Sequence, residues 1–145
     1  MGHSLHYLLM AGHAVFQKGV FAKLKDSGLS TGQPKVLDHL SVHDGDSQKD
    51  IARGCHIEPG SLTTLLKGMA EKGLVERRLM NGNRKTSHIF MTEKGRSRYA
   101  LVAQAFSEME AQAFRDIPEA EREQFLATFE KIYANLTERG AGSDC

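Results

Sequence analysis

The sequence predicts a mainly α-helical fold with one small β-hairpin, and three observations lead to this prediction. Apolar residues recur at the spacing of a buried helix face through most of the chain. Between residues 74 and 91 the pattern changes to two short strand-like segments around Asn81-Gly82-Asn83, which is a hairpin turn signal. The 145 residues are 40% hydrophobic and 26% charged, which is sufficient for one domain with a buried core.

The first two helices are predicted from apolar spacing and from the residues that interrupt it. A helix is expected over residues 5–24, and Asp26-Ser27-Gly28 should end it. Thr31 is expected to cap a second helix, because its hydroxyl can accept from a free N–H group of the first turn. Pro34 then lies in that turn, where a missing N–H costs little, and Asp44-Gly45-Asp46 should end the helix.

Two shorter helices are expected next, joined by a tight turn at residues 56–58. Ser47-Gln48-Lys49-Asp50 is a capping pattern, which predicts that a helix begins there and continues to residue 55. Pro59 suits the first turn of the fourth helix, and Gly73 suits the left-handed position just beyond its end. The buried stripe of that helix should consist of Leu62, Leu65, Leu66 and Met69.

The rest of the chain is predicted to form the hairpin and two long helices. Short strands are expected over residues 74–79 and 86–91, and Thr92 should cap the fifth helix. Pro118 should begin the last helix, and residues 139–145 should form a flexible tail. The apolar sides should consist of Leu101, Val102, Ala105, Phe106 and Met109 in the fifth helix and of Phe125, Phe129, Ile132, Tyr133 and Leu136 in the last.

Composition excludes several classes of protein. No apolar run approaches 18 residues, so no membrane span is expected, and the first residues lack the pattern of a signal peptide. The chain contains Cys55 and Cys145, too far apart in sequence to indicate a disulfide framework. We therefore expect a cytoplasmic protein that does not interact with membranes.

Charge is distributed unevenly, although the chain as a whole carries a net charge of only +1. Residues 47–98 contain 11 Lys and Arg against 5 Asp and Glu, whereas the rest contains 8 against 13. The segment that includes the two short helices and the hairpin therefore carries +6, and the remainder carries −5. Such asymmetry indicates that one part of the molecule binds a polyanion.

The order of two short helices, a tight turn and a hairpin is that of a winged helix-turn-helix, in which the second helix enters the major groove of double-stranded DNA. If the stripe of the fourth helix is buried, the opposite face presents small residues near the N-terminus and then one cation and one acid: Gly60, Thr63, Thr64, Lys67 and Glu71. Ser47, Gln48 and Lys49 could bind phosphate at the start of the third helix. The hairpin tip, with Arg84 and Lys85, suits a minor groove or a line of phosphates.

Several segments resemble the MarR family of transcriptional regulators, and the resemblance covers roughly residues 5–136. The most specific part runs from Lys72 to Gly95. The segments that carry it are Leu29-Ser30-Thr31-Gly32-Gln33, Gln48-Lys49-Asp50-Ile51-Ala52, Leu62-Thr63-Thr64-Leu65-Leu66, Met69-Ala70-Glu71-Lys72-Gly73-Leu74-Val75-Glu76-Arg77 and Met91-Thr92-Glu93-Lys94-Gly95. The resemblance implies a bacterial repressor that binds a palindromic operator as a homodimer and often releases it when a small, frequently aromatic, ligand binds.

Site residues follow from the resemblance in the same way. The helix that reads the major groove maps onto Gly60, Ser61, Thr63, Thr64 and Lys67. The family's hairpin carries Asp-x-Arg nine residues before the threonine that maps to Thr92, and this sequence has Asn83-Arg84-Lys85 there. Asn83 therefore stands where the family has the aspartate that orients the hairpin, and Lys85 stands where it has the arginine. Because lysine cannot make the forked contact of arginine, Arg84 is the candidate to make that contact instead.

The flanking helices are expected to form a dimer. Residues 1–25 and 100–138 form the predicted helical dimerisation region, and residues 29–98 form the predicted DNA-binding domain. The flanking segments have more apolar surface than one small domain needs, so they could cover each other between subunits. The alternative is that they fold back into one core.

A ligand pocket is expected between the first, second and fifth helices, near Phe16, His39 and His43. The two histidines are four residues apart on one helix, which could also place two ring nitrogens on one metal. No third ligand has diagnostic spacing, so no metal, cofactor or catalytic residue is predicted. Cys55 should face inward as a buried thiol with little thiolate character, rather than act as a redox sensor.

Two other functions remain open at this stage. A dimeric scaffold that has lost specific DNA readout would explain the altered hairpin. An enzyme with a histidine metal centre would need a complete ligand set, and the sequence offers only one pair.

Overall fold

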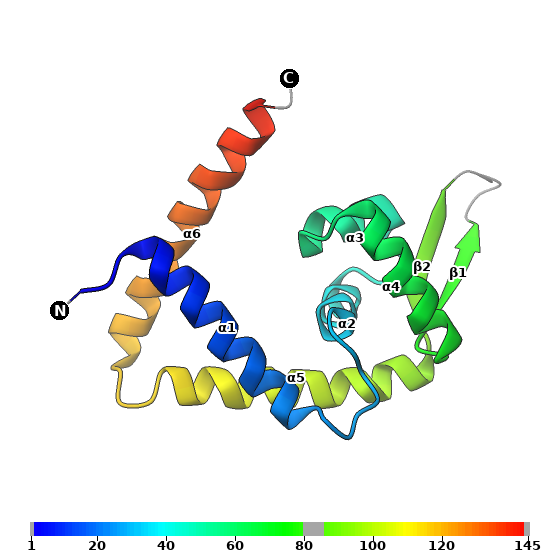
Figure 1. Cartoon of the computed structure of the whole chain (residues 1–145), viewed down its shortest axis with the longest axis horizontal. Helices are drawn as coiled ribbons and strands as arrows, with labels where there is room; N and C mark the ends of the chain where they lie inside the picture. The colour runs from blue at the N-terminus through cyan, green and yellow to red at the C-terminus, as the bar shows by residue number, and fades with distance from the viewer. Residues whose placement is uncertain (1, 80–85, 144–145) are drawn as a thin grey trace. The chain divides into compact units, whose positions relative to one another are not determined.

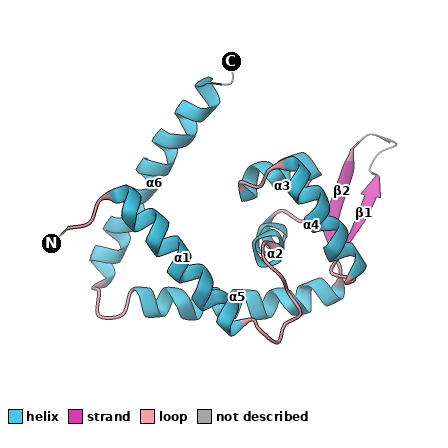
Figure 2. Ribbon diagram, viewed as in Figure 1, coloured by secondary structure: helices cyan, strands magenta, loops and turns pink. Residues whose placement is uncertain are grey.

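The structure is a computed structural model that describes residues 2–79 and 86–143, with side chains up to Glu138. These residues contain six helices and one two-stranded sheet (Figure 1). The elements are α1 (Leu5–Lys23), α2 (Gln33–Val42), α3 (Gln48–Cys55), α4 (Pro59–Glu71), β1 (Val75–Leu79), β2 (Ser87–Met91), α5 (Glu93–Ala113) and α6 (Glu119–Ser143). Figure 2 shows that helices predominate and that the strands form one hairpin, which confirms the predicted fold class.

Most element boundaries lie where the capping residues predict them. The backbone N–H of Asp50 donates to Ser47 Oγ at 3.1 Å, and the N–H of Gly95 donates to Thr92 Oγ1 at 3.0 Å. Gly73, just after the last turn of α4, has a φ of 76°, a left-handed conformation that glycine adopts without strain. Local sequence signals therefore define α3, the end of α4 and the start of α5.

The N-terminus of α2 differs from the prediction. Its N-cap is Gly32, not Thr31, and the φ of 90° at Gly32 lies in the left-handed region that favours glycine. No side chain among the described residues caps the helix; the Gln33 side chain instead reaches back, and its Oε1 accepts from the backbone N–H of Ser30 at 3.0 Å. Pro34 lies in the first turn as expected.

The core is formed where α1, α2, α3, α4, α5 and the hairpin meet. Its fully buried side chains include Leu37, Leu40, Ile51, Leu62, Leu66, Met69, Ile89 and Val102. Leu101 is expected on the inner side of α5, but it is 46% exposed. Val102, Ala105 and Met109 form the buried line of that helix, and Leu101 lies one position, or about 100° of helix rotation, away from Val102.

The hairpin is attached to the loop that precedes α3. β1 and β2 are antiparallel, with Val75 opposite Met91 and Leu79 opposite Ser87. The N–H of Gly45 donates to the Ile89 carbonyl at 2.8 Å, and the N–H of Ile89 donates to the Asp46 carbonyl at 3.0 Å. These bonds fix the start of α3 relative to the hairpin.

The chain divides into two compact units, Met1–Met109 and Glu110–Cys145, which differ from the predicted domains. The predicted dimerisation region, residues 1–25 and 100–138, is divided between the two units: α1 and α5 up to Met109 lie in the first unit, and the buried Val20 and Leu24 belong to its core. The Phe16 ring stacks on Phe106 with a centroid distance of 6.5 Å, and Gly19 approaches the Met109 side chain. Side-chain packing therefore extends the first unit along α5.

The second unit consists of the end of α5, a turn and α6. Arg122 lies over the Phe114 ring at 4.5 Å, and Phe114 contacts Phe125 edge-on. α6 continues to Ser143, whereas a flexible tail is expected from residue 139; glycine lowers helix propensity but does not forbid a helix. Among the described helices, none combines the length and the apolarity needed to cross a membrane.

Candidate nucleic-acid interface

α4 presents two chemically different faces. Leu62, Leu66 and Met69 are fully buried, and Leu65 is partly buried against Gly32. The opposite face is exposed and carries small or hydroxylated side chains and one cation: Gly60, Ser61, Thr63, Thr64 and Lys67. No heavy atom lies within 4 Å of the position that a Cβ would take at Gly60. A flat surface can therefore approach this part of the helix closely.

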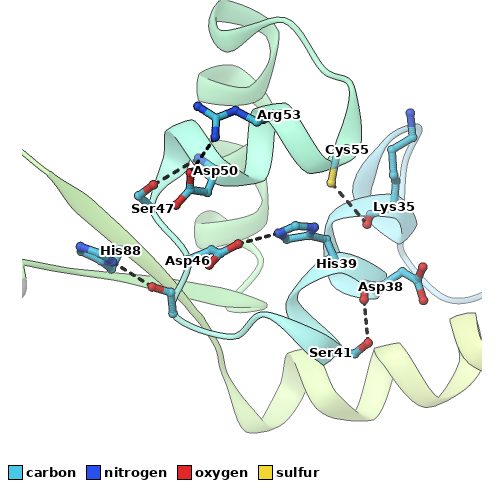
Figure 3. Close-up of polar contacts among 11 residues, drawn as sticks. Lys35, Asp38, His39, Ser41, Asp46, Ser47, Asp50, Arg53, Cys55 and His88 are labelled. Carbon is cyan, nitrogen blue, oxygen red and sulfur yellow. Dashed lines mark hydrogen bonds and ion pairs between the residues drawn. The ribbon is translucent and has the colours of Figure 1, made fainter. Parts of the chain in front are cut away.

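The first turn of α3 lies beside that face. Gln48 Nε2 donates to Thr63 Oγ1 at 2.7 Å, so the side chain of α3 contacts the exposed face of α4 directly. Lys49 is exposed, and no ion pair or hydrogen bond of its ammonium is found among the described residues. Ser47 is half-buried and its hydroxyl caps α3, which makes it a structural residue in this geometry (Figure 3).

Arg77 is a candidate that the sequence analysis missed. It projects from β1 into a groove that also contains Thr63, Lys67, Ala70 and Glu71 of α4. Side chains two apart in a strand share a face, so Arg77 lies on the same side of β1 as the buried Val75. That alternation is visible in the sequence and could have indicated a cation beside α4.

The neighbouring Arg78 has a different environment. Its guanidinium pairs with the carboxylate of Glu76 and lies 4.2 Å from the centre of the Phe90 ring. In contrast, neither Arg77 nor Lys67 has an ion-pair partner in the part of the chain that the structure describes. Two cations without a salt bridge to any described residue therefore line one groove together with the Glu71 carboxylate, so the groove keeps a net positive charge, which attracts phosphate groups. The other predicted hairpin contacts, Asn83, Arg84 and Lys85, lie outside the described residues.

The predicted ligand pocket does not bring its three residues together. His39 Nε2 lies 2.8 Å from Asp46 Oδ2 (Figure 3). The His39 and His43 rings are 4.8 Å apart. Phe16 instead lines a hollow in the first unit that includes neither histidine. Its other lining residues are His13, Gln17, Phe21, Gly32, Pro34, Lys35 and Phe106. The loop residue Asp46 faces His39, which directs this side chain toward α3 rather than toward α1.

Cys55 is buried on the inner side of α3, as the sequence predicts. Burial raises the pKa of its thiol, and the nearby Lys35 counteracts this only in part. Sγ lies 3.8 Å from the Lys35 carbonyl oxygen (Figure 3). The thiol therefore has little of the thiolate character that oxidation requires. Among the residues that can be described, no group of three or more potential ligands is placed to hold a metal ion.

Comparison with known proteins gives one consistent family. Residues 27–84 match the sequence model of the MarR family. An uncharacterised HTH-type transcriptional regulator of Bacillus subtilis, YwhA, is 27% identical over 97 residues, which are 67% of this chain and 70% of YwhA.

Solved structures match over a longer part of the chain. A MarR-family transcriptional regulator from Silicibacter pomeroyi is 27% identical, with a TM-score of 0.80 over 89% of this chain and 87% of that one. A complex of S. aureus MepR with DNA is 28% identical, with a TM-score of 0.80 over 93% of this chain and 99% of MepR. These relatives are regulators and not enzymes, which removes the metalloenzyme alternative. Residues 27–84 by sequence, and most of the chain by fold, are thus similar to the MarR family of winged helix-turn-helix transcriptional regulators.

Proposed function

We propose that the protein is a repressor that binds a palindromic operator in double-stranded DNA as a homodimer and responds to a small ligand. The observation that carries the proposal is the exposed face of α4, with Lys67 on the helix and Arg77 beside it. A helix fits the major groove of B-form DNA, and its exposed side chains then meet the edges of the bases. The DNA in the MepR structure is consistent with this role for the same fold.

Cations around α4 would position the protein on the phosphate backbone. Lys49 lies at the start of α3, Lys67 on α4 and Arg77 on β1, so the three side chains come from three elements of one domain. Phosphate contacts of this kind set register and orientation, whereas contacts with base edges give sequence specificity. A protein that reads the chromosome works where the DNA is, which accords with the expected cytoplasmic location.

Homodimer formation is supported by apolar side chains that each unit leaves exposed. In α1 they include Leu5, Leu8, Leu9, Met10 and Val15, and in α6 they include Phe125, Leu126, Tyr133 and Leu136. Their exposed fractions range from 37% at Leu9 to 69% at Val15. Water contact with this much apolar surface is unfavourable, and a second copy would remove it. Two-fold symmetry would also place two α4 helices on a palindrome, about 34–36 Å apart.

A ligand site is proposed at the hollow that Phe16 and Phe106 line, which measures about 210 Å³. Two stacked rings and the cation of Lys35 would suit a small aromatic anion. The hollow also contains Gly32 and Pro34 at the start of α2, so a ligand there would contact an element of the DNA-binding domain.

A binding titration tests the proposal. Operator DNA from the gene's own promoter region should bind about 10³-fold or more tighter than random DNA at the same salt concentration. Lys67→Ala should weaken binding, whereas the matched control Lys131→Ala, an exposed lysine of α6, should not. Light scattering should give the mass of a dimer. Equal affinity for random DNA would instead indicate a scaffold without specific readout, and a monomeric mass would contradict the homodimer.

A further inference from the structure

The hydroxyl of Thr63, at the centre of the exposed face of α4, is already committed within the protein. Thr63 Oγ1 donates its single proton to the Pro59 carbonyl oxygen, one turn earlier in α4, at 3.0 Å. The same oxygen accepts a hydrogen bond from Gln48 Nε2 at 2.7 Å. A hydroxyl has one proton and two lone pairs, so no donor and only one lone pair remain for a ligand.

These two contacts also restrict the rotation of the Thr63 side chain. A β-branched side chain has few favourable χ1 rotamers, and here two partners on different elements hold the oxygen in one of them. With the hydroxyl turned toward Pro59 and Gln48, the methyl group is the part of this exposed side chain that has no polar partner. Gln48 therefore acts as a positioning residue on Thr63.

A methyl group of an exposed α4 residue, whose hydroxyl is already bonded within the protein, has a specific counterpart in DNA. Among the four bases, only thymine presents a methyl group in the major groove, at C5. We propose that Thr63 recognises a thymine through methyl–methyl contact in each half-site, with Gln48 holding the threonine in the orientation that allows it. This inference rests on the proposed DNA-binding function and specifies one base of the operator.

Removal of single methyl groups from the DNA tests the proposal. The probe is the operator duplex, in which each thymine of a half-site, together with its symmetry mate, is replaced in turn by deoxyuridine, which lacks only the C5 methyl. Affinity is measured by fluorescence anisotropy at fixed salt. Wild-type protein should lose affinity at one position, by about fourfold for each buried methyl and so about 15-fold for the pair.

Variants of Thr63 then identify the reading residue. Thr63→Ser keeps the hydroxyl contacts and removes the methyl, so it should bind the unmodified operator more weakly and lose the effect of deoxyuridine at that position. Thr63→Val keeps a methyl but loses both hydrogen bonds that hold the side chain, so the effect should become smaller without disappearing. The matched control Thr64→Ser, on the same face, should leave that position unchanged. Gln48→Ala should reduce the difference between thymine and deoxyuridine, while equal melting temperatures exclude unfolding as the cause.

The outcomes separate this inference from the proposed function. If wild-type protein binds the operator specifically but tolerates every deoxyuridine, the thymine contact is wrong and the regulator remains. The same holds if Thr63→Ser keeps the sensitive position, and full wild-type sensitivity in Thr63→Val would show that the hydroxyl contacts do not position the methyl. If wild-type protein shows no preference for the operator, the proposed function itself fails.

Discussion

Arg77 and Arg78 are adjacent arginines of β1 with different surroundings, and this difference predicts different effects on DNA binding. Arg77 lines the groove beside α4 and has no ion-pair partner among the described residues. Arg78 pairs with Glu76 and lies over the Phe90 ring. We expect Arg77→Ala to weaken DNA binding and Arg78→Ala to affect mainly the stability of the hairpin.

The size of the effect follows from the number of phosphates that the variant no longer neutralises. Each neutralised phosphate contributes about 0.9 to the slope of log affinity against log salt concentration. A dimer of the Arg77→Ala variant neutralises two phosphates fewer, one for each subunit, so the slope should become shallower by about 1.8. When the salt concentration rises from 50 to 200 mM, both proteins should lose affinity, and the factor of loss should be about 12 times smaller for the variant than for wild-type protein.

Arg78→Ala should behave differently. The Glu76 and Arg78 side chains are about half exposed, so solvent screens their ion pair and its contribution to folding is small. The contact with Phe90 adds about 0.5–1 kcal/mol at an exposed site. We therefore expect a slightly lower melting temperature and an unchanged salt slope.

Anisotropy titrations of wild-type protein and both variants, with one operator duplex at four or more salt concentrations, give the slopes directly. Two results would refute the reasoning: an unchanged slope for Arg77→Ala, or equal changes for the two variants. The first would mean that the groove beside α4 does not face phosphate, and the second that general positive charge, rather than position, determines affinity.

Three further predictions concern the interior. Gly95→Ala should destabilise the fold by about 3 kcal/mol, because a Cβ there would overlap the backbone oxygen of Leu74; a decrease below about 1 kcal/mol in denaturant titration would contradict this. Since burial raises the pKa of Cys55 above its ordinary value of 9.0, its contribution to stability should be complete below that pH and should disappear as the pH rises through the higher folded-state value. In a Cys145→Ser background, stability should therefore fall more steeply above pH 9 than in a variant that also carries Cys55→Ala, and parallel curves would refute it. Lys72→Met should weaken operator binding more than Lys72→Arg, because the lysine attaches the end of α4 to the α1–α2 loop and to the start of α2; equal affinities for wild-type protein and Lys72→Met would show that this attachment does not matter.

Local signals account for the parts of the fold that the sequence predicted well. The caps at Ser47 and Thr92 and the left-handed Gly73 depend on residues within four positions of each other, so the sequence contains all the information needed. The orientation of α4 was predictable for the same reason, because its apolar stripe is regular. The candidate residues of that helix therefore lie on the exposed face as expected.

The errors arise where contacts between distant segments decide the structure. Thr31 is a good capping residue, but a left-handed backbone at the next position makes Gly32 the N-cap. Phe16 and His39 belong to different surroundings, because the loop residue Asp46 holds His39. Strand alternation places Arg77 on the same side of β1 as the buried Val75, but the packing of β1 against α4, which periodicity does not give, brings it to the candidate site.

The contacts of Lys72 provide a physical route between the proposed ligand site and the helix that would read DNA. Lys72 Nζ donates to the Gly28 carbonyl oxygen and to Gln33 Oε1, both at 2.8 Å. Gln33 is only 3% exposed and lies in sequence between Gly32 and Pro34, which both line the hollow. A ligand that displaces this turn would move a buried partner of Lys72 and so change the attachment of α4. Because a buried hydrogen bond to a charged group is costly to break, about 1.5–3 kcal/mol, one such link is sufficient to bias the orientation of a recognition helix.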